Sequence, residues 1–530
     1  MADRRSVTPV PPPGRLENEE RERAEAQRLE SEAFSAAQEE RERRKEEYAR
    51  AKKDEEQLLN QAWRKQNRPY LFISGAFLML FISLVGYLIY FNVCLRDRVL
   101  ANPYNKRQDT LNEYVIRGDI LSRNGEVLAE TVFAEDGAEI RTYPYGRLFA
   151  HVVGFAVRGR SGLESICNYD LLSSHNAVID RILNEFEGKR NPGDILLTTL
   201  DADLQRAAYD ALGDYRGAVA VLDPASGEIL AMVSKPDFDP NTIDADWNAI
   251  VEDEQSGRLL NRALQGLYPP GSTFKIVTAL AYIRSHENYE DFSFQCSGEL
   301  AGKESTIHCF EGIAHGEEDL ESAFANSCNS AFAAIGLEEG AGRLKNAAES
   351  LLFNKDIPIA LSNRSARFSL REGESEGLIM QTAFGQGNTL ATPFQMALAV
   401  SAIANGGVLM QPYLVRGTVS RDGTHASETK PKEYGRLISE EEAETLSRLM
   451  RAVVSEGTAS RLSELPCAVY GKTGSAEYVR SDGSVGTHSW FVGFSEEGIA
   501  LSVLAEDGGP GSSTAVPIAE RVFEAFEQKR

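Results

Sequence analysis

The fold of this chain is decided by three short stretches: Ser272-Thr273-Phe274-Lys275, Ser327-Cys328-Asn329 and Lys472-Thr473-Gly474. They read S-x-x-K, S-x-N and K-T-G, in this order along the sequence. Each pattern alone is weak, because short patterns with two fixed letters often arise by chance. All three together, in this order, indicate a serine acyl-transfer enzyme.

The first stretch has the local context that a nucleophilic serine needs. Tyr268-Pro269-Pro270-Gly271 interrupts any preceding element, and residues 273–283 have a helical pattern. Ser272 is therefore expected at a helix N-terminus, with Lys275 one turn further on the same face. A lysine can act as the base for a serine if burial keeps it neutral. The competing interpretation is a capping serine and a surface lysine, but the apolar run 276–280 predicts that this helix enters the interior.

The second stretch follows an interruption, Ala325-Asn326, in an Ala-rich helical pattern. Ser327 is suited to relay a proton between Lys275 and a leaving amine. Asn329 offers both a donor and an acceptor for a substrate amide. Taken alone, a plain turn between two helices explains this stretch equally well.

The third stretch, continued by Ser475, leads into a strand pattern over residues 476–479. Gly474 would let a substrate backbone approach the strand closely. Thr473 and Ser475 can hold a terminal carboxylate, with Lys472 supplying positive potential. Gly471-Lys472-Thr473 also matches the end of a phosphate-binding loop, but that loop needs a glycine where Pro466 stands, so we discard it.

Further patterns extend the likeness to a known family. They are Gly385-Gln386-Gly387, Thr392-Pro393-Phe394-Gln395, Gly457-Thr458-Ala459 and the run 488–494. With the three motifs, the chain resembles the class B penicillin-binding proteins, the D,D-transpeptidases that cross-link bacterial peptidoglycan. One departure is Ser475, where the family often has threonine, although the hydroxyl group is kept.

The resemblance implies an α/β (α+β) transpeptidase domain with a central antiparallel sheet between helices. It implies that Ser272 attacks the D-Ala-D-Ala carbonyl, that neutral Lys275 takes its proton, and that Ser327 with Lys472 serves the leaving group. The backbone N–H groups of Ser272 and Ser475 would form the oxyanion hole. No metal or organic cofactor is expected.

The order of apolar runs is consistent with that fold. Residues 218–222 and 229–234 read as a hairpin, residues 489–494 and 499–505 read as buried strands, and helical runs lie between them. This predicts a sheet in which strands from both ends of the domain pair. Earlier, residues 116–129 read as a second hairpin that turns at Asn124-Gly125.

Composition divides the chain into four segments. Residues 1–69 form a charged tail, helical or disordered, and residues 70–94 a transmembrane helix, since 71–94 contain no charged residue. Residues 95–193 are expected to form a smaller pedestal or dimerisation-like domain, and residues 194–530 the transpeptidase domain. A cleaved signal peptide is disfavoured because the leading charged region and the apolar run are both too long.

Charge and family likeness together constrain the partners. The net charge of −23 over 530 residues argues against a nucleic-acid binder. The resemblance implies peptidoglycan stem peptides, β-lactams, the membrane and a SEDS-type glycosyltransferase as partners. It also implies a single-pass protein of the bacterial cell membrane, with a cytoplasmic N-terminus and an extracytoplasmic catalytic domain. Two alternatives stay open: a D,D-carboxypeptidase or β-lactamase-type hydrolase, and a non-enzymatic β-lactam sensor.

The six cysteines contain no C-x-x-C pair. Cys296 and Cys309 bracket a short loop or hairpin, so a disulfide between them is the first hypothesis. A zinc site using Cys296, Cys309, His308 and His315 ranks below it, because the ligand spacing is not that of a standard zinc finger. Two unpaired thiols are the third possibility.

Overall fold

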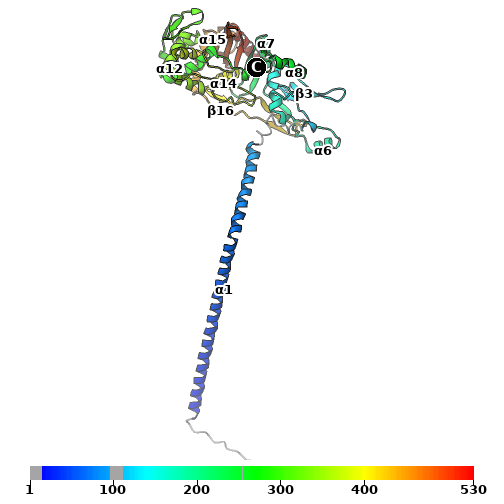
Figure 1. Cartoon of the computed structure of the whole chain (residues 1–530), viewed down its shortest axis with the longest axis vertical. Helices are drawn as coiled ribbons and strands as arrows, with labels where there is room; N and C mark the ends of the chain where they lie inside the picture. Colours follow the sequence, from blue (N-terminus) through cyan, green and yellow to red (C-terminus); the bar gives the residue numbers. More distant parts are fainter. Residues whose placement is uncertain (1–14, 96–110, 254, 481, 530) are drawn as a thin grey trace, which may run out of the picture. The chain divides into compact units, whose positions relative to one another are not determined.

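The computed structural model describes residues 15–95, 111–253, 255–480 and 482–529, in two compact units that are each described by themselves. The first unit contains α1 (Arg15–Tyr90), which ends in one π-helical turn, η1 (Phe91–Leu95) (Figure 1). The charged part of α1 carries exposed ion pairs at i,i+4 spacing, including Arg44–Glu40 and Arg50–Glu46. Predictions that concern residues 1–14 and 96–110 fall outside the described residues.

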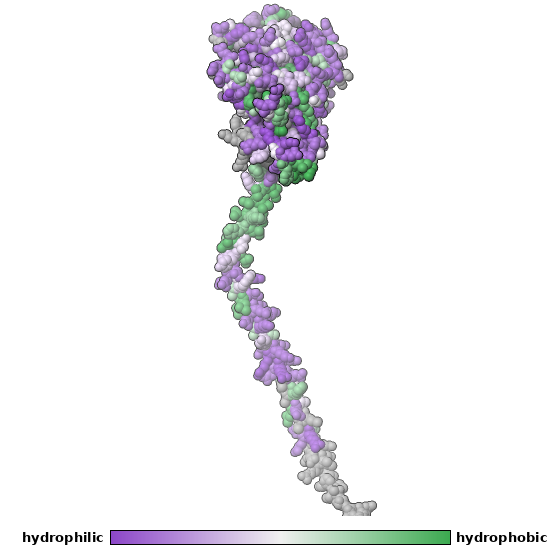
Figure 2. All heavy atoms as spheres, turned by 90° about the vertical axis from the view of Figure 1, so that its right-hand side faces the viewer, coloured by the Kyte–Doolittle hydropathy of each residue, from purple (hydrophilic) through white to green (hydrophobic). Residues whose placement is uncertain are grey.

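The apolar part of α1 is visible as the green stretch in Figure 2. Within the described residues, α1 with its π-helical turn is the one helix long and apolar enough to cross a bilayer. The uncharged run of residues 71–94 spans about 36 Å at ~1.5 Å per residue, against a hydrocarbon core of about 30 Å. Its large apolar side chains are exposed, as expected for a lipid-facing helix.

The second unit begins with a mixed six-stranded sheet in the order β15-β14-β6-β2-β3-β4. The predicted hairpin at Asn124-Gly125 is confirmed, because β2 pairs antiparallel with β3 and Gly125 has a φ of +92°. Strands β14 and β15 come from much later in the chain, so this sheet joins two distant segments. The strand bounds are Ile120–Leu121 (β2), Val127–Phe133 (β3), Glu139–Thr142 (β4), Ile195–Thr198 (β6), Val415–Val419 (β14) and Ala426–Glu428 (β15).

Short elements complete this part of the second unit. A parallel pair joins β1 (Val115–Ile116) to β5 (Asn191–Pro192). The short helices are η3 (Gly146–Phe149), α3 (Ala150–Val153), α4 (Gly162–Ile166), α5 (Asn168–Leu171) and α6 (Val178–Phe186). The six-stranded sheet contains strands from both sides of the proposed domain boundary at 193/194, with β2, β3 and β4 before it and β6, β14 and β15 after it. The boundary therefore stays a prediction.

The second sheet has five longer, antiparallel strands in the order β17-β18-β19-β7-β8. Strand β7 pairs with β19, so the predicted pairing of strands from both ends of the domain is confirmed. Strand β17, which carries the K-T-G motif, is an edge strand. The bounds are Gly217–Leu222 (β7), Ile229–Lys235 (β8), Val469–Val479 (β17), Val485–Ser495 (β18) and Ala500–Ala505 (β19).

Helices cover both faces of this sheet. The evidence is that alternate residues of β7 belong to two different core clusters, one on each face. Val219 and Val221 pack in the cluster that contains Leu204 of α7 (Ala202–Leu212). Ala218 and Ala220 pack in the cluster that contains Phe394 of α14 (Pro393–Ala404). This period of two is that of a strand buried on both sides. The predicted antiparallel sheet between helices is therefore confirmed.

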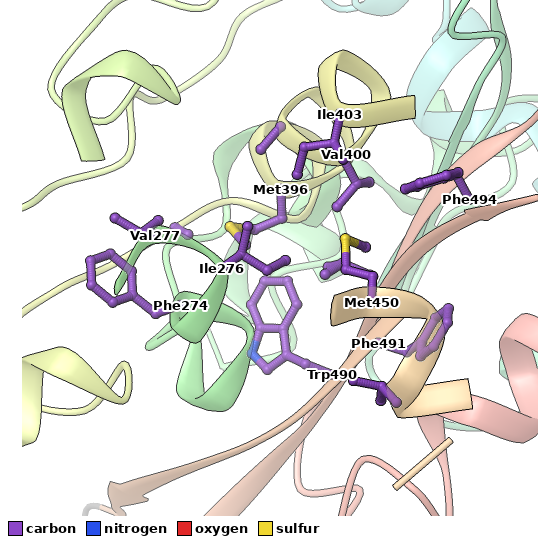
Figure 3. Packing of buried hydrophobic residues seen from close by; sticks show 14 of the residues in the cluster. Phe274, Ile276, Val277, Met396, Val400, Ile403, Met450, Trp490, Phe491 and Phe494 are labelled. Carbon is purple, nitrogen blue, oxygen red and sulfur yellow. The ribbon is translucent and has the colours of Figure 1, made fainter. Parts of the chain in front are cut away.

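The remaining helices build the region around the three motifs. α10 (Lys275–Ser285) packs against α12 (Asn329–Ser350) and the sheet, and Figure 3 shows the Trp490 ring of β18 next to the helix that carries Ile276. The other elements are α8 (Ile243–Glu252), α9 (Arg262–Gln265), η4 (Gly271–Phe274), η5 (Tyr289–Asp291), η6 (Phe310–Gly312), α11 (Leu320–Ala325), α13 (Glu376–Ala383), α15 (Glu440–Ser455), η7 (Ser460–Glu464) and α16 (Ala515–Glu527). Short strands are β9 (Phe294–Cys296), β10 (Glu299–Ala301), β11 (Thr306–His308), β12 (Gly316–Glu318), β13 (Val408–Met410) and β16 (Glu433–Arg436).

Candidate active site

Ser272 lies in η4, one 3-10 turn before α10 begins at Lys275. The turn is held in place by the Thr273 hydroxyl, which donates to Pro270 O at 2.7 Å, and by the Trp490 indole N–H, which donates to Pro269 O at 3.0 Å. Ser272 is half-buried and lines the cleft, whereas Lys275 is fully buried. The predicted helix N-terminus at Ser272 is confirmed, with a 3-10 rather than an α-helical first turn.

The three motifs meet at two buried lysine side chains. Lys275 Nζ lies 3.2 Å from Ser272 Oγ and 3.1 Å from Ser327 Oγ. It also donates to Ser327 O at 2.6 Å and to Asn329 Oδ1 at 2.8 Å. From the opposite motif, Lys472 Nζ lies 2.9 Å from Ser327 Oγ. The hydroxyl of Ser327 therefore bridges the two amines.

Burial makes the ammonium forms of both lysines stronger acids, so that they lose their protons more readily. Burial lowers the pKa of Lys275 to about 7, against a partly offsetting influence of Cys328, Cys309 and Glu318. Burial also lowers the pKa of Lys472 well below its usual value, and the positive charge of Lys275 lowers it further. Two amines that contact one hydroxyl titrate as a pair, and one of them is available as a neutral base near neutral pH.

Ser327 occupies a strained turn between α11 and α12. Its φ of +57° lies in the left-handed region, which residues with a Cβ rarely adopt. The turn is stabilised because Lys275 Nζ binds Ser327 O, and because the next residue, Cys328, caps α12 by accepting a bond from Ala331 N at 3.3 Å. Asn329 then begins α12, and its Nδ2 donates to His308 O at 3.1 Å.

Strand β17 places the K-T-G residues along one wall of the cleft. The Thr473 hydroxyl contacts the Thr458 hydroxyl at 2.6 Å, and Ser475 Oγ accepts a bond from Gly511 N at 3.2 Å. A Cβ on Gly474 would lie 3.0 Å from Thr273 Cγ2 and 3.1 Å from Pro270 O. Gly474 therefore lets β17 pack against the turn that carries Ser272. Its predicted role in substrate approach stays a prediction.

The motifs line a cleft of about 960 Å³. Of the eight predicted site residues, Ser272, Ser327, Asn329, Thr473, Gly474 and Ser475 line it, and Lys275 and Lys472 lie buried directly beneath. Its carboxylates are Glu311 and Glu477, both exposed. Among the hydrogen bonds of the described residues, neither carboxylate contacts Ser272 or Lys275. A further carboxylate, Glu164 of α4, does not line the cleft and is fully buried between Arg117 and Arg141.

The zinc hypothesis is wrong about one residue, His308. Cys296 and Cys309 do lie together, with their sulfurs 3.7 Å apart, but both are free thiols in this structure. His308 does not join them, because its side chain is 63% exposed and its Nδ1 lies 3.4 Å from Glu299. The third sulfur of the group belongs to Cys328, the middle residue of the S-x-N motif.

Sequence reasoning missed several supporting residues. Two phenylalanine rings lie 5.5 Å from the lysine ammonium groups, Phe332 from Lys275 and Phe324 from Lys472. Both are fully buried and supply the low-dielectric surroundings of the amines. The sequence marks Thr458 only as part of a family pattern and does not predict its contact with Thr473. No local sequence signal distinguishes these residues from ordinary core and loop residues.

Comparisons with known proteins agree with this geometry. Residues 217–524 match the family model for the penicillin binding protein transpeptidase domain, and residues 117–196 match the penicillin binding protein A dimerisation domain. The chain is 32% identical over 484 residues to the peptidoglycan D,D-transpeptidase PbpA of Mycolicibacterium smegmatis, covering 86% of this chain and 97% of the relative.

Solved structures are similar over most of the second unit. The D,D-transpeptidase domain of a peptidoglycan glycosyltransferase from Eggerthella lenta has a TM-score of 0.70 and 31% identity, over 78% of this chain and 98% of that one. Penicillin-binding protein A from M. tuberculosis, in a ceftriaxone acyl-enzyme complex, has a TM-score of 0.71 and 29% identity, over 78% of this chain and 99% of that one.

Proposed function

Because the chain belongs to the penicillin-binding protein transpeptidase family, we propose that Ser272 is the nucleophile of a membrane-anchored peptidoglycan D,D-transpeptidase. The observation that carries this assignment is the buried Lys275 amine, with its pKa lowered to about 7, at 3.2 Å from Ser272 Oγ. A serine hydroxyl needs a neighbouring base, and this amine is both close and neutral in a large fraction of molecules at pH 7.

The acylation half-reaction follows from the contacts. Neutral Lys275 takes the Ser272 proton as Oγ attacks the penultimate D-alanine carbonyl of a stem peptide. The N–H groups of Ser272 and Ser475 are assigned to the resulting oxyanion. The bond to the terminal D-alanine breaks, and its nitrogen receives a proton through Ser327 Oγ, which contacts both lysine amines. D-Alanine leaves, and the stem peptide stays as an ester on Ser272.

The second half-reaction uses the same groups in reverse. An amino group of a neighbouring stem peptide loses a proton to the lysine pair through Ser327 and attacks the ester carbonyl. The Ser272 oxygen leaves and regains its proton from Lys275. A peptide cross-link has then formed, and the enzyme is restored without net gain or loss of protons.

Substrate binding is assigned to the wall opposite Ser327. The Thr473 and Ser475 hydroxyls face the cleft and are suited to bind the terminal carboxylate of D-alanine, or the carboxylate of a β-lactam. Lys472 adds positive potential when it is protonated. Asn329 reaches the cleft from α12, where its amide is suited to the peptide group of the donor stem.

The test of this function is labelling with fluorescent penicillin. The wild-type chain is expected to give a stable ester, and Ser272→Ala is expected to give none. The exposed Ser369 lies outside the cleft, and Ser369→Ala serves as the matched control that keeps the label. Label on Ser272→Ala would refute the nucleophile assignment.

A second assay separates transpeptidation from its alternatives. With a donor stem peptide and an acceptor amine, the cross-linked product is expected to exceed the hydrolysed one. Predominant hydrolysis would favour a carboxypeptidase, and rapid turnover of penicillin would favour a β-lactamase. If deletion of residues 2–68 abolished a signalling output and no cross-linking occurred, the sensor alternative would be favoured.

The topology and the glycan-polymerising partner complete the proposal. We assign residues before Tyr70 to the cytoplasm and the catalytic unit to the outside, since peptidoglycan cross-linking occurs there. A cysteine placed at Ser35 is then expected to resist an impermeant maleimide in intact cells. A SEDS-type glycosyltransferase is the proposed partner, and recovery of a polytopic protein of that class after in-cell cross-linking tests it.

A further inference from the structure

Three cysteine sulfurs and one imidazole meet beside the S-x-N turn. Cys296 ends β9, Cys309 follows β11, His315 precedes β12, and Cys328 caps α12. One ligand atom from each of the four side chains lies within 4.8 Å of all the others. The three cysteines are buried and His315 is half-buried. None of the four is used by the acyl-transfer chemistry described above.

Three of the six distances between these atoms are close to those of a tetrahedral metal site, and the other three are at most 4.8 Å. With Zn–S near ~2.3 Å and Zn–N near ~2.0 Å, tetrahedral angles put two sulfurs about 3.8 Å apart and a sulfur and a nitrogen about 3.5 Å apart. The Cys296–Cys309 and Cys309–Cys328 sulfur pairs are both 3.7 Å apart. Cys296 Sγ and His315 Nδ1 are 3.4 Å apart.

A hydrogen-bond donor is available to each sulfur. Gly298 N–H donates to Cys296 Sγ at 3.4 Å, and Ala331 N–H donates to Cys328 Sγ at 3.3 Å. Ser330 Oγ lies 3.2 Å from Cys309 Sγ. The N-terminus of the long helix α12 also favours negative charge on Cys328. Such donors stabilise thiolates, and they are the usual surroundings of cysteine ligands to a metal.

We propose that Cys296, Cys309, Cys328 and His315 bind one Zn²⁺ in a closed, four-coordinate structural site. Three thiolates and one imidazole are a donor set that zinc favours, and four protein ligands leave no open position for catalysis. A Cys296–Cys309 disulfide would leave Cys328 as an unpaired thiol in the same group. The site assigns a role to every one of the four side chains.

The segment that supplies three of the ligands has very little core of its own. Residues 294–318 consist of two two-stranded ribbons, β9–β12 and β10–β11. Within them, the only buried side chains are Cys296, Ile307, Cys309 and Glu318. A segment of this size with one buried aliphatic residue gains little stability from apolar packing of its own, so a metal cross-link would stabilise its shape.

The proposed zinc site lies next to the catalytic cleft, so the metal would affect the geometry of the active site. Residues 306–311 of this segment line the catalytic cleft, and His308 O accepts the Asn329 amide bond at 3.1 Å. Cys328 lies between the two functional residues Ser327 and Asn329, and the shared zinc ion would tie it to this segment. Two of the ligands, Cys309 and His315, also line the cleft. The zinc site therefore positions the S-x-N turn against the cleft wall.

The first test measures the metal directly, with no dependence on penicillin binding. The full-length chain, purified in detergent with a thiol reductant and no added metal, is expected to carry about one zinc ion per chain. Cys296→Ser and His315→Asn are expected to lower the zinc content at least about tenfold. The buried Cys467, which lies beside Glu497 and Glu527, provides the control: Cys467→Ser should keep its zinc.

A second measurement covers variants that fail to fold. Cobalt(II) exchanged into the wild-type chain is expected to show thiolate-to-metal charge transfer and the strong visible bands of a tetrahedral thiolate site. No bound zinc together with an octahedral cobalt spectrum would overturn the proposal. So would a Cys296–Cys309 disulfide in a non-reduced peptide map of the chain purified without the reductant, or loss of zinc from Cys467→Ser alone.

The positioning role has its own readout. Removing zinc by chelation is expected to slow penicillin acylation of the wild type by about tenfold or more, and one equivalent of zinc should restore it. The folded fraction is followed by circular dichroism in the same samples. Acylation that is unchanged after complete zinc removal would refute the positioning role, while the metal count would still decide the site itself.

Discussion

The pH dependence of acylation gives the sharpest test of the lysine assignment. With its ordinary pKa of 10.5, a lysine is neutral in only about 0.03% of molecules at pH 7. Burial lowers the pKa of Lys275 to about 7, which leaves about half of the molecules neutral at that pH. Burial therefore raises the reactive fraction by roughly a thousandfold at pH 7.

The perturbation is a change of pH from 5 to 7. A base with a pKa of about 7 is neutral in about 1% of molecules at pH 5 and in about 50% at pH 7. The second-order rate constant for acylation by penicillin is therefore expected to rise roughly fifty-fold, with a slope near one on logarithmic axes. The sign follows because only the unprotonated amine can accept the Ser272 proton.

The assay is stopped-flow acylation with fluorescent penicillin, with circular dichroism at each pH to show that the chain stays folded. Samples held at pH 5 and returned to pH 7 should recover the full rate. Lys275→Arg provides the matched variant, since arginine keeps its proton and should reduce acylation by at least about a hundredfold at every pH. A wild-type rate that stays constant from pH 5 to 7 would refute the role of Lys275 as base.

Three further outcomes follow from single contacts. Gly474→Ala places a Cβ 3.0 Å from Thr273 Cγ2 and Trp490 Cβ, so we expect a stability loss of about 1–3 kcal/mol by chemical denaturation and slower acylation; unchanged values would show that β17 and η4 separate freely. Thr458→Val removes the 2.6 Å contact with Thr473 Oγ1, and weaker penicillin binding with a smaller change in the maximal acylation rate is expected; the opposite split would contradict a binding role for Thr473. In Glu164→Gln, Arg117 and Arg141 lose their buried carboxylate partner, which should cost about 3–5 kcal/mol at pH 7. Burial alone would raise the pKa of Glu164, but the two arginines hold it below 4.5. The stability difference between the wild type and Glu164→Gln should therefore shrink as the pH falls through the folded-state pKa. A difference that stays constant with pH would argue against an ionised Glu164.

The local part of the site could be read directly from the sequence. Ser272 and Lys275 are three residues apart on one helical turn, and their contact depends only on that helix forming. The contact of Lys472 with Ser327 spans 145 residues, and no local rule predicts it. It depends on β17 lying beside the turn between α11 and α12, which only the family resemblance suggested.

The strand pattern of the sequence itself argues against His308 as a member of the cysteine cluster. In β11, Ile307 is buried and His308 exposed, while Cys309, the next residue, is buried. Neighbouring residues of a strand point in opposite directions, so His308 and Cys309 could not both enter one cluster. Cys328 was overlooked because its motif gave it no chemical role. The pairing of β14 with β6, across more than 200 residues, also had no signal in local patterns.

The strained turn at Ser327 explains why its neighbours are so tightly constrained. A left-handed residue with a Cβ costs roughly 1–3 kcal/mol and persists only when its surroundings leave no alternative. On one side, Lys275 Nζ holds Ser327 O at 2.6 Å; on the other, the Cys328 sulfur caps α12 and lies in the sulfur cluster. These restraints aim one hydroxyl at two buried amines, and relaxation of the turn would break both contacts at once. The middle residue of S-x-N, Cys328, thus helps to fix the geometry on which the proposed role of Ser327 depends.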